Sequence, residues 1–184
     1  MGQWIDGPIL RAQGVNVNQQ TVDMVLAFVS FFGLPNGTEP VVGVPFWCRL
    51  VVGVDNPPVG YVPTVNGVDL PANVSLVQNT TSPTCFLRNT TNNTESEVTL
   101  DTAADCTIAH PPLQNGALSL GNRSIPAFRI FTFNFQAVAN APVAGQVIKG
   151  FVGSQYGNLS PQVSFRTATQ AAPPPTAGRI AYRS

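Results

Sequence analysis

Side chains able to do acid–base or nucleophilic chemistry are few and widely spaced in this sequence. His110, in the stretch TIAHPP, is the single histidine, and a catalytic triad or a histidine metal site needs partners around it. The two prolines that follow favour a loop or the end of a strand. Ser154, in GFVGSQYG, has neither the spacing of a nucleophile elbow nor a base nearby. The sequence therefore predicts a protein without catalytic residues or a small-molecule substrate.

One acidic stretch, TESEVTLDTAAD, carries enough carboxylates to suggest a metal site. They belong to Glu95, Glu97, Asp101 and Asp105. Calcium takes several oxygen ligands from one loop, but the spacing of a calcium-binding loop is not present here. Residues 98–100 instead have the pattern of a strand, and acidic residues on an edge strand discourage aggregation. We therefore expect a solvated acidic edge and no metal or other cofactor.

The single lysine, Lys149, lies among apolar residues in GQVIKGFVG. It could be buried and paired, or linked covalently to an asparagine, as in some viral shells and surface adhesins. The simpler interpretation is a strand lysine whose aliphatic stem lies on apolar surface while its amine reaches water.

Three cysteines and a set of glycosylation sequons bear on the compartment. Cys48 lies within an apolar strand pattern and is expected to be a buried free thiol. Cys85 and Cys106 could bridge a hairpin, but an odd cysteine total argues against a fully oxidised secreted scaffold. The seven sequons begin at Asn36, Asn73, Asn79, Asn89, Asn92, Asn122 and Asn158. They favour an extracellular or eukaryotic-virus setting, and their occupancy stays open.

The scarcity of charge favours a surface that neighbouring subunits cover. Charged residues make up 10% of the 184-residue chain and the net charge is zero, whereas about 25% is usual for soluble domains. The arginines are spread singly, which argues against nucleic acid as a partner. The start, MGQWIDGPIL, lacks the features of a signal peptide, although the sequence leaves open whether Met1 is native. The longest apolar run, residues 22–34, is too short to span a bilayer.

The elements that carry these residues are expected to be strands. Glycine and proline, 16 and 17 in number, interrupt any long helix. Alternation places Phe46, Cys48 and Leu50 on one face of a strand and Trp47, which we expect to be buried, on the other. The alternation at residues 131–135 places Phe131, Phe133 and Phe135 in the core. Residues 21–32 favour a strand over a short helix.

Shorter strands are expected at 61–65, 68–70, 74–78, 97–100, 145–152 and 163–167. The dipeptide Asn66-Gly67 predicts a hairpin turn between the first two. Residues 84–87 and 97–100 are expected to pair, with the sequence RNTTNNTE as an exposed tip. The predicted fold is all-β: one antiparallel β-sandwich or jelly-roll-like barrel of about 8–10 strands.

Arms are expected on either side of this domain. We assign residues 1–20 to an N-terminal arm, 21–167 to the domain with a polar hairpin excursion at 78–107, and 168–184 to a proline-hinged C-terminal arm. Residues 173–175 are consecutive prolines, which form a stiff spacer. The short strand pattern after them suggests exchange with a neighbouring subunit, and a disordered tail is the alternative.

These observations favour a non-enzymatic structural protein of a virus or phage particle, such as a capsid, cement (decoration) or tail subunit. Its partners would be copies of itself, a trimer being one arrangement, and other shell or tail subunits, with no membrane. Its location would be the virion. The alternative is a secreted or cell-surface β-sandwich that acts as an adhesin or carbohydrate-binding module.

Overall fold

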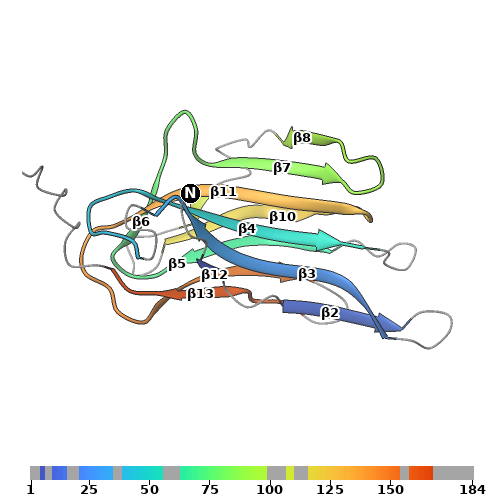
Figure 1. Ribbon diagram of the computed structural model, residues 1–184, viewed down its shortest axis with the longest axis horizontal. Helices are drawn as coiled ribbons and strands as arrows, with labels where there is room; N and C mark the ends of the chain where they lie inside the picture. The colour runs from blue at the N-terminus through green and yellow to red at the C-terminus, as the bar shows by residue number, and fades with distance from the viewer. Residues whose placement is uncertain are drawn as a thin grey trace, which may run out of the picture.

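The computed structural model describes residues 5–6, 10–15, 21–34, 39–55, 63–98, 107–109, 116–153 and 158–167. Every regular element among them is a strand, and the strands form two antiparallel sheets (Figure 1). The large sheet has eight strands: β1 (Ile5–Asp6), β2 (Leu10–Val15), β3 (Thr21–Phe32), β4 (Phe46–Val54), β6 (Val74–Val77), β7 (Thr84–Asn89), β8 (Glu95–Val98) and β11 (Arg129–Ala139). The small sheet has five: β5 (Thr64–Leu70), β9 (Thr107–Ala109), β10 (Gly116–Ser124), β12 (Gln146–Gly153) and β13 (Gln162–Phe165).

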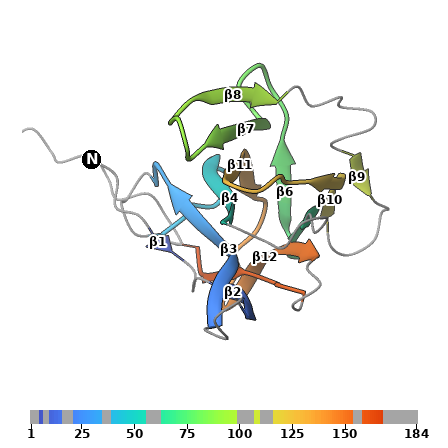
Figure 2. The same ribbon diagram turned by 90° about the vertical axis from the view of Figure 1, so that its right-hand side faces the viewer.

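The chain passes repeatedly between the two sheets. The large sheet has the order β1-β3-β4-β11-β7-β8, with β2 also paired to β3 and β6 to β11, and the small sheet has the order β13-β12-β5-β10-β9. The links β4 to β5, β5 to β6, β8 to β9, β10 to β11 and β11 to β12 therefore all change sheet. Figure 2 views the molecule from its end, with β7 and β8 on one side and β2 on the opposite side. Since the described strands form two separate sheets, the prediction of a β-sandwich is confirmed.

Alternating side chains of both sheets fill the space between them. Phe131, Phe133 and Phe135 are fully buried, as predicted, and the rings of the last two stack with centroids 5.2 Å apart. Phe31 of β3 meets Phe165 of β13 edge to face at 5.4 Å, which joins the large sheet to the small one. Aromatic pairs of this kind stabilise a core beyond their buried area alone. The strand alternation in the sequence therefore places the core correctly.

The expected hairpin at Asn66-Gly67 is wrong. Both residues lie inside β5, which runs unbroken from Thr64 to Leu70. The register against β12 shifts here, since Phe151 pairs with Gly67 while Val152 pairs with Val65. Asn66 is thus an extra residue on β5, a bulge, and it lets Val65 and Val68 both be buried although they differ in parity. Asn66 and Gly67, whose residue types favour a turn, therefore lie at a bulge within β5 and not in a hairpin turn.

The thirteen described strands exceed the predicted number. β10 was not predicted, because its sequence GALSLGNRS is rich in small and polar residues. Residues 10–15 of the expected N-terminal arm form β2, which pairs antiparallel with β3. The expected C-terminal arm, 168–184, lies outside the described residues.

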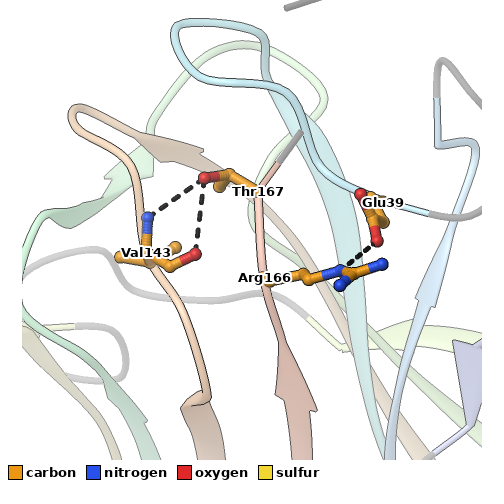
Figure 3. A network of polar contacts seen from close by, with 4 residues as sticks. All are labelled: Glu39, Val143, Arg166 and Thr167. Atoms are coloured by element: carbon orange, nitrogen blue, oxygen red, sulfur yellow. Dashed lines mark hydrogen bonds and ion pairs between the residues drawn. The ribbon is translucent and has the colours of Figure 1, made fainter. Parts of the chain in front are cut away.

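A polar network anchors the end of β13 to two other segments (Figure 3). The backbone amide of Thr167 donates to the carbonyl of Val143 at 3.0 Å, and the amide of Val143 donates to the Thr167 hydroxyl at 3.0 Å. Beside it, the guanidinium of Arg166 forms an ion pair with Glu39. The last described residues are therefore held in the domain.

Candidate interaction surface on the large sheet

The candidate residues for catalysis or metal binding do not form a site in the part of the chain that the structure describes. Glu95 and Glu97 are exposed on β8, whereas Asp101, Asp105, His110 and Ser154 lie outside the described residues. No group of three His, Cys, Asp or Glu side chains able to hold a metal ion occurs among the described residues. A helix long and apolar enough to cross a membrane is likewise absent from the described segments.

The two cysteines that the structure describes, Cys48 and Cys85, both lie in the core. Cys48 is buried and free, as predicted, and burial raises the pKa of its thiol well above the ordinary value. Cys85 is also buried, on β7. Cys106 lies outside the described residues, so the Cys85–Cys106 bridge stays a prediction.

Lys149 is half-buried on β12 and faces Asp69 of β5 across the strand pair. Burial raises the pKa of the Asp69 carboxyl, and the positive charge of Lys149 opposes that rise. This agrees with the interpretation of Lys149 as a strand lysine near the rim, and its charge partner is Asp69.

The outward-facing side of the large sheet is unusually apolar. We call it the outer face, and it consists of alternate residues of the central strands, which point away from the small sheet. They are Leu26, Phe28, Ser30 and Phe32 of β3; Trp47, Arg49, Val51 and Gly53 of β4; Ile130, Thr132, Asn134, Gln136 and Val138 of β11; and Thr84, Phe86 and Arg88 of β7. The solvated side of an antiparallel sheet normally carries polar residues, so this face needs an explanation.

An aromatic and cationic cluster lies at one end of the outer face. Trp47 was expected to be buried, but it is half-buried here and stacks on Phe32 with ring centroids 5.5 Å apart and 21° between the planes. The guanidinium carbon of Arg49 lies 4.8 Å from the centre of the Phe32 ring. Its Nε donates to Asn134 Oδ1 at 2.8 Å. The guanidinium therefore contacts side chains of both neighbouring strands, Phe32 on β3 and Asn134 on β11.

The outer face and its β8 edge carry few charged side chains. Burial lowers the pKa of Arg49, and the carboxylate of Glu95 partly opposes this shift. Arg88, near the β8 edge, is exposed and donates to the side-chain oxygen of Asn93. Glu95 and Glu97 lie at the β8 edge itself. Arg49 is thus the charged residue at the middle of the face, whereas Arg88 and the two glutamates lie toward the β8 edge.

Ser30 is a polar residue that the outer face buries completely. It is 0% exposed, and its hydroxyl oxygen has no hydrogen-bond partner among the described residues. An unsatisfied buried hydroxyl is uncommon and costs stability. Its neighbours therefore cover this part of the face tightly even in one chain.

The tip of the polar excursion is exposed, as predicted. β7 pairs with β8, with Cys85 opposite Val98, and residues 90–94 between them are exposed. The amides of Thr91 and Thr94 donate to Asn89 and Asn92 at 2.9 and 3.2 Å. These local bonds define the turns. The predicted pairing of the two segments is confirmed, with the second strand starting two residues earlier than expected.

Comparison with known proteins shows only remote likeness. No family model matches the chain, and no curated protein matches it. The solved structure titled "AvmM Catalyzes Macrocyclization in Alchivemycin A Biosynthesis" is 12% identical, with a TM-score of 0.42, over 80% of this chain and 91% of that chain. A family 123 glycoside hydrolase from Clostridium perfringens is 11% identical, with a TM-score of 0.36, over 82% of this chain and 28% of that chain. At such low scores neither likeness says anything about the activity of this chain.

Proposed function

We propose that this chain is a non-enzymatic structural subunit of a virus or phage particle, such as a capsid, cement (decoration) or tail protein. The observation that carries the proposal is the outer face of the large sheet, where eight of the sixteen outward-facing residues have apolar side chains and four of these are aromatic. A contiguous apolar surface of this kind marks an interaction site in soluble proteins.

The composition supports the same function. Nine basic and nine acidic residues leave the 184-residue chain without net charge, and a protein that stays monomeric usually keeps a net charge for colloidal stability. A subunit that remains packed against copies of itself has no such need. Burial of the outer face against neighbouring subunits would prevent aggregation, as a net charge does for a free monomer.

The partners in this proposal are copies of the chain and other shell or tail subunits, and the location is the virion. Residues 168–184 would serve as an exchanged arm that pairs with a neighbouring subunit. The network of Thr167 and Arg166 supports that role (Figure 3), because an arm can link two subunits firmly only if its base is fixed. The fold itself does not choose among these roles, since β-sandwiches serve many functions.

Native mass spectrometry of the chain isolated from its source tests the proposal. We expect complexes that contain many copies or other shell components, in fixed ratio. A single unmodified chain, recovered free of any particle, would contradict the proposal. The same spectrum reports glycan mass and disulfide status.

A carbohydrate-binding module is the second candidate, and the position of Trp47 favours it. The indole is half-buried on the outer face, with hydrogen-bonding groups of Arg49 and Asn134 on the neighbouring row. Sugar-binding surfaces combine an aromatic platform with polar groups. Titration with a panel of oligosaccharides, followed by Trp fluorescence, tests this candidate. Saturable quenching that a Trp47→Ala variant loses would favour it over the structural role.

A further inference from the structure

We infer that Asn92, at the tip of the β7–β8 hairpin, is an N-glycosylation site that carries an oligosaccharide in the native protein. The inference goes beyond the proposed function, because it concerns one modified side chain and the compartment through which the chain passes. The chain has seven sequons, against about two expected from its asparagine, serine and threonine content. This excess favours a protein that meets the glycosylation machinery, and the structure distinguishes among the sequons.

The side chain of Asn92 is fixed with its amide nitrogen turned away from the chain. Its Oδ1 accepts hydrogen bonds from the backbone amide of Thr94 at 3.2 Å and from the Thr94 hydroxyl at 2.7 Å. Because the oxygen of the carboxamide faces Thr94, the nitrogen faces away, and no described residue accepts a hydrogen bond from Nδ2. Asn92, Asn93 and Thr94 are all exposed. The atom that accepts a glycan is therefore open to solvent.

The tip is held by further hydrogen bonds, so the turn presents Asn92 in a defined place. The backbone amide of Asn89 donates to the carbonyl of Thr94 at 2.7 Å, which closes the hairpin. Nε of Arg88 donates to Oδ1 of Asn93 at 2.9 Å. Asn93 has a left-handed backbone with a φ of 58°, which asparagine adopts more readily than most residues. A glycan on Asn92 would break none of these bonds, because Nδ2 takes part in none of them.

Two nearby sequons of the same Asn-X-Thr type differ from Asn92 in their contacts. Nδ2 of Asn79 donates to Oε1 of Gln136 at 2.8 Å, so a glycan there would disturb a bond to the large sheet. Asn89 is half-buried at the end of β7 and shares a strand face with the buried Cys85. A glycan on Asn89 would have to leave from the core side of the strand. Asn92 is thus the acceptor that the folded hairpin accommodates best.

The modification is the transfer of an oligosaccharide from a lipid-linked pyrophosphate donor. Nδ2 of Asn92 attacks the anomeric carbon of the first sugar, and a new C–N bond replaces the bond between that carbon and a phosphate oxygen. The lipid pyrophosphate leaves, and the proton lost from Nδ2 passes to a base of the transferase. The product keeps one N–H and the Oδ1 acceptor, so both hydrogen bonds from Thr94 persist in the folded glycoprotein.

A glycan at Asn92 also suits the position of β8. This strand is the last described one at its edge of the large sheet (Figure 1), and its Glu95 and Glu97 are exposed. An edge strand invites pairing with other chains, and charge or cover discourages that pairing. A hydrophilic glycan just before β8 adds such cover. In a particle, the tip would then face solvent, and the subunits would pass through the secretory pathway of a eukaryotic cell.

Peptide mapping of the chain isolated from its source tests the inference. Peptide-N-glycosidase F in heavy-oxygen water converts a glycosylated asparagine to an aspartate that carries the heavy label. We expect this label at position 92 in peptides that contain the hairpin tip. An unmodified Asn92 in the source chain would overturn the inference.

Variants of the full chain, secreted from cultured animal cells, identify the site independently. Thr94→Ala removes the Asn92 sequon and Asn92→Gln removes the acceptor, so each should lower the intact mass by that of one glycan. Thr94→Ser keeps a hydroxyl in the sequon and should keep the glycan. The matched control, Thr91→Ala, removes the Asn89 sequon and should keep the full glycan mass. If Thr94→Ala keeps that mass, or Thr91→Ala loses a glycan, Asn92 is not the site.

The outcomes separate the modification from the structural role. Particles whose subunits have a bare Asn92 would refute the glycan and leave the structural role standing. A chain that carries the glycan but is recovered only as a free monomer would refute the structural role and leave the glycan standing. Circular dichroism checks that each variant is folded.

Discussion

Replacing Gly150 with alanine tests how closely the two sheets approach each other. A Cβ at Gly150 of β12 would lie 2.8 Å from Cδ1 of Leu50 on β4 and 3.3 Å from Cγ of Pro161. Leu50 is fully buried, so its side chain has little room to turn away. Added atoms in a packed core cost about 1–3 kcal/mol.

The expected result is a loss of about 2 kcal/mol, or about 4–8 °C in melting temperature for a chain of this size. Chemical denaturation, followed by circular dichroism, measures the loss. Gly53→Ala is the matched control. Its added Cβ would meet nothing closer than Leu26 Cβ at 3.9 Å, so it should be neutral or slightly stabilising, by up to about 1 kcal/mol.

A double-mutant cycle identifies the contact that causes the loss. Leu50→Ala alone creates a cavity and should cost about 2–5 kcal/mol. In that background the Gly150→Ala exchange should cost little, because the clashing methyl group is gone. If Gly150→Ala is harmless in wild type, or costs the same in both backgrounds, then β12 does not pack on β4 as described.

Three further predictions concern single side chains. Ser30→Ala removes a buried hydroxyl without a described partner and should stabilise the fold by about 1–2 kcal/mol in urea denaturation; a loss of stability would mean that the hydroxyl is bonded. Burial raises the pKa of Asp69, so the stability linked to its protonation is present below the unfolded pKa of about 3.9 and is lost as the pH rises through the folded pKa. Asp69→Asn should therefore be slightly more stable than wild type at neutral pH, and denaturation across pH should show the difference vanish in acid; a constant difference would refute this. The raised pKa of the Cys48 thiol predicts that iodoacetamide at about pH 8, near the pKa of an exposed thiol, labels Cys48 only after denaturation, and labelling of the native chain on peptide mapping would contradict its burial.

The long strands could be predicted from the sequence because their hydrophobic pattern is strong. Phe131, Phe133 and Phe135 alternate with polar residues, and all three are buried as expected. Residues 21–32 form one strand, β3, over the predicted range. In both cases β-branched and aromatic residues meet the demands of a pleated, packed surface.

Other features depended on pairing that a single strand does not encode. β10 has a weak pattern of its own and forms where β5 and β9 pair with it on either side. Asn66-Gly67 has the chemistry of a turn, but β12 and β10 both pair along β5 and turn the site into a bulge. Local propensity gives way to the sheet when pairing on both sides is available.

The outer face was missed for a related reason. Alternation assigned one side of β4 to the core, and Trp47 on the other side was assumed to be covered as well. Only the sheet order brings Phe28, Phe32 and Trp47 together with Ile130 and Phe86 from distant parts of the chain. The low charge content predicted that neighbouring subunits cover part of the surface, but it did not predict which part.

Sedimentation of the wild-type chain over a wide range of concentrations tests the central claim of a self-associating structural subunit most directly. The account predicts a mass that rises with concentration from one chain to a dimer or a larger assembly. A mass that stays at that of one 19.5 kDa chain at every concentration, with the protein folded and soluble, would contradict it.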